Sequence, residues 1–394
     1  MKKNYFLKII FFLFFALIFP FFQITKAQLI FQGKDLSSYV LKEYQQKVEK
    51  ALDNAGENSE ELIKFLTSVN PEYKKGASFL LAYMPYADLI QIKSEVLLDN
   101  INYAYKSLEE FSWGKDLPEE IFLNYLLPYR NSQEPIENFR PYFFEKLSPL
   151  VKDLNSATEA AILVNRWVAE RVKYKPTQRE DQGPFQTLKG GYGRCEELVI
   201  LYNDALRSIG IPARDCWTPY WATQDDNHAW TEIWIDSMWH YTGAAEPSDK
   251  LNQAWFDNVV KKASLVFSKP YGEPPSFEKK YIDEKGEILV NSTDFYTQTG
   301  EFEIEVTKDG KPVNDISVFF SVFNYGALRK ISSIKTNEYG RAFLSIGKGT
   351  YFICSGDGEN YTWKVESIEN NQKKKVILEL NQLPKEKDSF WLRY

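Results

Sequence analysis

A glycine-rich turn followed at once by an amphipathic helix constrains the fold of this chain most. The turn contains Gly190, Gly191 and Gly193 and ends directly before Cys195. Apolar residues then recur at steps of three and four, the spacing of one helix face. They are Leu198, Leu201, Tyr202, Ala205 and Ile209. The pattern predicts a helix that begins at Cys195 and ends at Gly210, because glycine commonly terminates helices.

Cys195 and His228 form the candidate catalytic pair. A thiol in the first turn of a helix lies near unpaired backbone N–H groups and the positive end of the helix dipole, and both favour the thiolate. His228 begins an alternating strand further along the chain. It would act as a base, or as the imidazolium of an ion pair with the sulfur. The sequence therefore predicts a cysteine nucleophile with a lowered pKa.

Residue counts argue against several other chemistries. The chain has two histidines and three scattered cysteines without a Cys-x-x-Cys motif, so we expect no metal site. The glycine-rich turn matches neither a P-loop nor a dinucleotide-binding fingerprint, and we expect no cofactor. The formal net charge of −6 disfavours a nucleic-acid partner.

The N-terminus has the parts of an export signal. Three lysines in the first eight residues precede an apolar run over 9–22, and Ala27 is a small residue suited to cleavage. The run is short for a bilayer span, and no later segment is apolar enough to cross a membrane. We therefore expect residues 1–27 to be removed and the mature chain to be secreted or periplasmic. Loss of the four lysines in 1–27 makes its formal charge −10.

Three segments follow the export signal. Residues 28–145 are predicted to be helical and to pack against the next segment. Residues 146–275 read as an α+β catalytic domain, with a helix that Ser156 caps, the Cys195 helix, and strands near 213–220, 229–235 and 238–242. Residues 276–394 alternate apolar and polar positions between turns, which predicts an antiparallel β-sandwich.

Three cysteines in an exported protein leave at least one thiol unpaired. Cys195 is the natural unpaired one. Cys216 lies in a predicted strand and Cys354 in the distant β-rich segment. We expect both to be buried structural thiols, with a Cys216–Cys354 disulfide as the alternative.

Three ordered motifs carry a family resemblance. They are GYGRCEE at 191–197, LRSIGIPAR at 206–214 and HAWTEIW at 228–234. In this order and spacing the region 155–247 resembles the transglutaminase-like superfamily. The resemblance implies a papain-like α+β fold in which a helix-borne cysteine meets a histidine and an acid from neighbouring strands. Residues 309–351 resemble the transthyretin-like or carboxypeptidase-regulatory-like sandwich, an accessory module that implies no catalysis.

The chain departs from the family pattern at the acid. The resemblance implies an Asp shortly after Trp239, and Gly243 occupies that position. Glu246 would orient His228 if the strand breaks at Gly243, and a Cys–His dyad is the alternative. Glu232 shares a strand face with His228, and a structural carboxylate is its simpler interpretation. The other histidine, His240, has no motif around it and is interpreted as structural.

The resemblance leaves the reaction open, because the superfamily includes protein cross-linkers, cysteine proteases and peptide N-glycanases. Attack of the thiolate on an amide carbonyl would give a thioester, with the Cys195 N–H among the oxyanion donors. Water as acceptor favours an amidase or protease acting on a protein, peptide or glycopeptide. The alternatives are a cross-linking acyltransferase, an N-glycanase-like amidase and a non-catalytic binding protein. Trp217, Trp221 and Trp230 are candidate substrate-binding residues, with core packing as the simpler interpretation.

Overall fold

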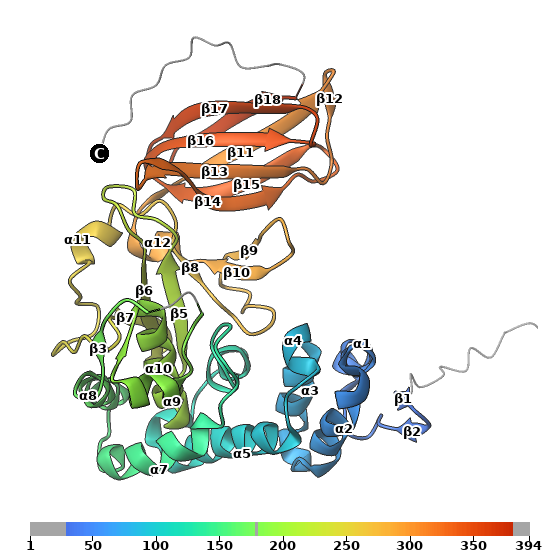
Figure 1. The fold of residues 1–394 in the computed structure, drawn as a ribbon, viewed down its shortest axis with the longest axis vertical. Helices are drawn as coiled ribbons and strands as arrows, with labels where there is room; N and C mark the ends of the chain where they lie inside the picture. The colour runs from blue at the N-terminus through green and yellow to red at the C-terminus, as the bar shows by residue number, and fades with distance from the viewer. Residues whose placement is uncertain (1–28, 178–179, 381–394) are drawn as a thin grey trace, which may run out of the picture.

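The computed structural model describes residues 29–177 and 180–380. The predicted export signal lies outside these residues. The chain is of the α+β class, with a helical N-terminal region, a mixed central domain and a C-terminal sandwich of strands (Figure 1). No helix in the described part of the chain is both long and apolar enough to span a bilayer.

The N-terminal region is predominantly helical, as the sequence predicts. A short hairpin precedes the helices, and their apolar faces share one core that includes Leu52, Leu66 and Leu97. The elements are β1 (Ile30–Phe31), β2 (Lys34–Asp35), α1 (Gln45–Ala55), α2 (Ser59–Ser68), α3 (Lys74–Ala82), α4 (Tyr86–Leu89), α5 (Ser94–Glu110), α6 (Glu119–Ile121) and α7 (Phe139–Val151).

Helix α7 joins this region to the central domain. Phe143 and Leu147 of α7 share a core with Leu201 and Tyr202, so the predicted boundary near residue 145 lies within a helix that both parts use. Arg140 is buried, and its guanidinium donates to the carbonyl oxygens of Arg207, Leu126 and Pro128 at 2.7–3.0 Å. The helical region is therefore fastened to the central domain by packing and by a buried cation.

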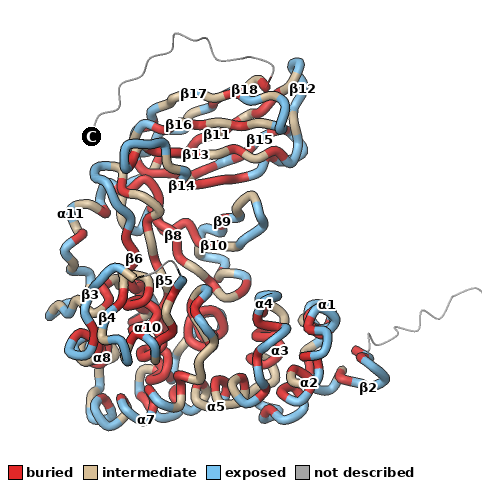
Figure 2. Tube along the Cα trace, in the orientation of Figure 1, coloured by how far each residue is buried: buried red, intermediate tan, exposed pale blue. Residues whose placement is uncertain are grey.

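The central domain consists of helices packed against one face of an antiparallel sheet. Ser156 caps α8 by accepting a hydrogen bond from the Glu159 N–H at 3.3 Å. Most of α10 is buried between α7, α8 and the sheet (Figure 2). The elements are α8 (Ala157–Ala169), β3 (Lys173–Tyr174), α9 (Pro184–Gly190), β4 (Tyr192–Gly193), α10 (Cys195–Ser208), β5 (Ala213–Thr218), β6 (His228–Ile235), β7 (Met238–Thr242), α11 (Asp257–Val260) and β8 (Phe267–Ser268).

The sheet of the central domain continues past residue 276. Its six strands lie in the order β7-β6-β5-β8-β10-β9, where β9 (Lys280–Ile282) and β10 (Ile288–Asn291) follow the predicted boundary. β10 pairs with β8 through Val290 and Asn291. The central domain therefore extends beyond the boundary predicted at 276. The sequence did not indicate this, because β9 and β10 are too short to show an alternating pattern.

A buried ionic group joins this late segment to strands β5 and β6. Arg214 of β5 donates through Nε to Glu232 of β6 at 2.6 Å and through a terminal nitrogen to Glu278. Tyr296, the last residue of α12 (Thr293–Tyr296), donates to the other Glu232 oxygen at 2.6 Å. Glu232 is therefore a structural carboxylate, in agreement with its simpler interpretation.

The C-terminal domain is a sandwich of two four-stranded sheets. One contains β12, β11 and β15, with β18 parallel to β11, and the other has the order β14-β13-β16-β17. Alternating apolar residues such as Phe302, Phe320 and Tyr351 meet between them. The strands are β11 (Thr299–Lys308), β12 (Lys311–Pro312), β13 (Ser317–Asn324), β14 (Ala327–Lys335), β15 (Arg341–Gly347), β16 (Gly349–Gly356), β17 (Tyr361–Ile368) and β18 (Lys373–Glu379).

Candidate active site

The glycine-rich turn has a defined backbone function. Gly191 ends α9 with φ +71°, a conformation that strains other residues. A side chain at Gly193 would approach the Glu197 Cβ to 3.0 Å. Glu197 is fully buried and accepts hydrogen bonds from the Arg194 N–H at 2.8 Å and the Thr177 hydroxyl at 2.8 Å. The turn is thus fixed from both sides, and Cys195 follows it as the first residue of α10.

Cys195 lies where α10 meets the beginning of β6. Its Sγ donates to Glu196 Oε2 at 3.2 Å, and the backbone N–H of Ala229 points to the sulfur. Burial, followed by the Glu196 carboxylate, raises the pKa of the Cys195 thiol to about 12, although the Ala229 N–H acts in the opposite direction. The predicted lowering of this pKa is therefore wrong, because burial and a like charge outweigh the helix terminus.

His228 is the first residue of β6 and directly precedes Ala229. Four aromatic rings surround its imidazole, with centroids 4.8–6.4 Å away: Trp221, Trp230, Trp255 and Phe256. The ring atom Nε2 is buried and has no hydrogen-bond partner among the described residues. Burial lowers the pKa of His228 to about 4, opposed by the nearby charge of Asp226. The imidazole is therefore neutral around pH 7.

Two of the three candidate substrate-binding tryptophans, Trp221 and Trp230, lie in the protein core, and Trp217 is partly buried. Trp221 and Trp230 are 1% and 0% exposed, which leaves neither ring a face for a ligand. Trp230 donates to the Tyr296 hydroxyl at 2.8 Å, and Trp217 packs against Phe267 at 6.0 Å. Trp221 and Trp230 are therefore core residues that enclose His228, and substrate binding by Trp217 stays a prediction.

Glu246 occupies the space that Gly243 leaves free. β7 ends at Thr242, so the strand breaks directly before Gly243, as an orienting function of Glu246 requires. A Cβ added at Gly243 would lie 2.1 Å from Glu246 Oε2, so this carboxylate fills the volume of the missing side chain. Glu246 Oε1 accepts a hydrogen bond from Trp255 Nε1 at 3.2 Å, and the Trp255 ring contacts His228. The described residues show no direct Glu246–His228 hydrogen bond, and the orienting function of Glu246 stays a prediction.

The second histidine, His240, and the other two cysteines lie outside the candidate active site. His240 lies on the outer strand β7, and its Nδ1 is 2.9 Å from Asn252 Nδ2. The three cysteines are free thiols, with Cys216 buried and Cys354 partly buried. Burial raises the pKa of both of these thiols. Cys216 and Cys354 thus remain unpaired, as expected.

Two residues at the rim of the site were not identified from the sequence. Tyr174 of β3 is largely exposed, and its pKa is raised by partial desolvation of the hydroxyl, followed by electrostatic interaction with Cys195 and Asp226. Trp255 is also exposed and touches the imidazole. The only sequence signal for Tyr174 is its place before the glycine-rich turn, and the parallel pairing of β3 with β4 explains its proximity.

A family model and solved structures resemble this chain. Residues 147–243 match the model of the transglutaminase-like superfamily. This segment is a transglutaminase-like domain. Because the match ends at Gly243, the position of the acid lies at its edge. A comparison with curated protein sequences finds no match.

Among solved structures, the similarity is distant. A candidate cysteine protease from Cytophaga hutchinsonii is 13% identical with a TM-score of 0.30, over 66% of this chain and 61% of that protein. Red sea bream transglutaminase is 9% identical with a TM-score of 0.28, over 66% of this chain and 65% of that protein. A candidate protease from Parabacteroides distasonis is 11% identical with a TM-score of 0.27, over 70% and 53%. The chain thus spans about three fifths of the length of the first two.

The environment of Cys195 predicts how the thiol reacts. Because its pKa is about 12, alkylation by iodoacetamide should accelerate with pH and reach no plateau below pH 9. Glu196→Gln removes the like charge, lowers the thiol pKa and should increase the rate at pH 8 by about 3–10-fold, the effect of roughly one pKa unit or less. Site-resolved mass spectrometry separates Cys195 from Cys216 and Cys354. A plateau near pH 7 would show that the thiolate is already stabilised.

Proposed function

We propose that this protein is an exported, cysteine-dependent amide hydrolase of protein or peptide substrates. One observation carries the proposal. The sulfur of Cys195 faces the backbone N–H of Ala229, the residue after His228, so nucleophile and base project from adjoining positions at the start of α10 and β6. The transglutaminase-like match over 147–243 covers both elements.

The pKa values favour a mechanism that begins from a neutral pair. At pH 7 the thiol is protonated and the imidazole is neutral. The imidazole accepts the thiol proton as sulfur attacks the amide carbon, and the carbonyl oxygen becomes an oxyanion that backbone N–H groups stabilise. His228 then gives the proton to the leaving amine, the C–N bond breaks and a thioester remains. Water, deprotonated by His228, attacks the thioester and releases the carboxylic acid and the thiol.

A cross-linking acyltransferase is the second candidate, since an amine can replace water at the last step. Glu196 contacts the sulfur, and Asp226 affects the pKa of both Tyr174 and His228. Carboxylates at this place attract a protonated amine before it reacts. Trp221 and Trp230 are buried and offer no surface for stacking on a glycopeptide substrate, which leaves the partly exposed Trp217 and the exposed Trp255.

Two acceptors in one experiment distinguish these reactions. Purified protein is incubated with denatured casein, with and without the fluorescent amine dansylcadaverine, and Cys195→Ala is the control. New peptide ends, or glutamines converted to glutamates, indicate hydrolysis, and fluorescent casein indicates acyl transfer; ammonia leaves a glutamine carboxamide in both reactions and does not separate them. A binding protein without turnover would give neither product. It would leave the wild type indistinguishable from Cys195→Ala, and the proposal would then be abandoned.

The pH dependence of kcat/KM is a separate prediction. His228 must be neutral to accept the thiol proton, and its pKa is lowered from 6.5 to about 4. Activity should therefore persist through pH 5–6 and fall only as the pH drops through about 4, where imidazolium forms. An acid limb centred near 6.5 would indicate a solvated histidine and contradict this environment.

Export is the part of the proposal that concerns localisation. It rests on the lysines, apolar run and Ala27 of residues 1–27. Expression of the full chain in a Gram-negative host, followed by fractionation and N-terminal sequencing, tests it. A mature protein that begins at Gln28 in the periplasm or medium supports export, whereas an intact Met1 in the cytoplasm refutes it.

A further inference from the structure

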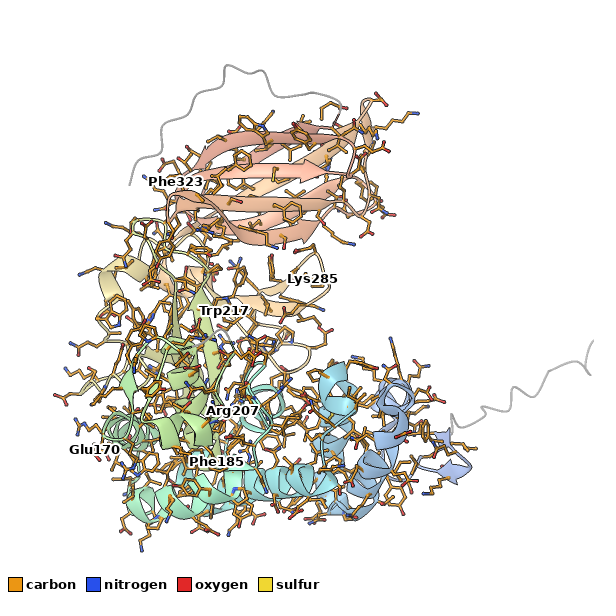
Figure 3. The ribbon with its side chains drawn as sticks, viewed as in Figure 1. Glu170, Phe185, Arg207, Trp217, Lys285 and Phe323 are labelled. Carbon is orange, nitrogen blue, oxygen red and sulfur yellow. The ribbon has the colours of Figure 1, made fainter. Side chains whose placement is uncertain are left out.

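The turn between β13 and β14 of the sandwich contacts the catalytic domain beside His228. This turn consists of Tyr325 and Gly326, and Asn324 directly precedes it as the last residue of β13. Figure 3 labels the preceding residue, Phe323, at the end of the sandwich that faces the catalytic domain. Asn324 is 1% exposed, although it lies at the end of a strand, because the loop that leads into His228 covers it.

The Asn324 side chain bonds three backbone groups of that loop. Its Nδ2 donates to the carbonyl oxygens of Trp221 at 3.1 Å and Gln224 at 2.8 Å. Its Oδ1 accepts from the Asp226 N–H at 3.2 Å. One amide thus satisfies both ends of the segment 221–226. These are long-range tertiary contacts, because Asn324 and Asp226 are about a hundred positions apart in the chain.

The neighbouring residue strengthens the contact. The Tyr325 N–H donates to Asp225 Oδ1 at 2.7 Å. A hydrogen bond to Asp226 raises the pKa of the Tyr325 phenol. Two consecutive residues of the sandwich, Asn324 and Tyr325, therefore bind Gln224, Asp225 and Asp226 of this loop.

The loop needs such support because its backbone is closed tightly and strained. The Trp221 N–H donates back to the Asp226 carbonyl at 3.0 Å, and Asp226 has φ +118°. Non-glycine residues held in this region are strained and persist only where surrounding contacts impose the conformation. The loop delivers Trp221, whose ring stacks on the His228 imidazole at 6.4 Å. Release of the loop would expose His228 to water.

We infer that Asn324 of the C-terminal sandwich is a positioning residue for the catalytic histidine, holding the segment 221–226 so that His228 stays enclosed beside Cys195. The sandwich therefore completes the site, in contrast to the accessory function that its family resemblance implies. The inference relies on the proposed function only in calling the Cys195–His228 pair catalytic.

Titration of His228 by NMR tests the inference without any substrate. The chain has two histidines, so a His240→Gln background leaves one imidazole signal. In the full chain, Asn324→Ala should raise the pKa of His228 by about one unit or more, toward its ordinary 6.5, because water reaches the ring. Asn324→Asp is a second, isosteric variant, which keeps the acceptor for Asp226 but loses both donated bonds.

Asn337→Ala is the matched control. Asn337 caps another turn of the same sandwich, accepting from the Tyr339 and Arg341 N–H groups at 3.0 and 3.1 Å, and contacts no catalytic residue. It should leave the pKa of His228 unchanged. Folded Asn324 variants without a pKa change, or an equal change in Asn337→Ala, would overturn the inference. A shift in both Asn324 variants supports it even if the wild type hydrolyses no amide, so the two proposals fail separately.

Discussion

His228→Ala is expected to lower turnover on an amide substrate by about 10²–10⁴-fold, the usual contribution of a positioned general acid–base group. The alanine variant removes the group that accepts the thiol proton and later protonates the leaving amine. The effect should fall on kcat, because His228 is enclosed by aromatic rings and has little surface with which to bind the ground-state substrate. Steady-state kinetics with an amide substrate identified in the casein assay measures it.

His240→Ala is the internal control for this prediction. His240 lies on β7 and bonds to Asn252 at the surface, so its loss should leave most of the turnover. Circular dichroism and thermal melting establish that both variants fold. Comparable activity in the two variants would mean that the base is elsewhere. A residual rate in His228→Ala that imidazole added to the buffer restores would strengthen the assignment.

Local sequence signals predicted the helix that begins at Cys195 and the strands beside it. The glycine turn, the 3.6-residue periodicity after Cys195 and the alternation after His228 each act over short distances, and α10 begins at Cys195 as expected. The break at Gly243 was also visible, because small residues end a strand pattern. In these places local preference and tertiary structure agree.

The electrostatics of the site could not be predicted in the same way. The helix terminus favours a thiolate, but that effect is modest, and burial between α10 and β6 reverses it. Burial depends on Trp221, Trp230 and Phe256, which only the folded sheet brings around His228. The sign of a pKa shift is thus a tertiary property here.

The domain boundary was missed for a related reason. β9 and β10 have three and four residues, too few for alternation to identify their sheet. Their assignment depends on pairing with β8 and on the contact of Glu278 with Arg214, which are remote in sequence. Likewise, nothing in the sequence around Asn324 indicates that its side-chain amide bonds to the loop 221–226 before His228.

Arg214→Met is expected to lower the free energy of unfolding of the central domain by about 3–5 kcal/mol, the typical cost of breaking a buried ion pair. Arg214 is the counterion of two buried carboxylates, Glu232 and Glu278, and methionine would leave both without a positive charge. Its guanidinium also lies 3.8 Å from the Trp239 ring, a contact that methionine replaces only in part. Denaturant unfolding followed by tryptophan fluorescence measures the loss, because the tryptophans of the central domain dominate that signal.

Arg341→Met is the matched control, because it removes the same charge at the surface of the sandwich. Arg341 is 46% exposed and lies 3.5 Å from Glu303 and 3.7 Å from Glu305, where solvent screens the pair, so about 0–1 kcal/mol is expected. Equal losses in the two variants would contradict the buried-counterion argument. Arg214→Met should also disturb the candidate active site, because Glu232 lies on the strand that begins with His228. The alkylation rate of Cys195 should therefore change in Arg214→Met and not in Arg341→Met.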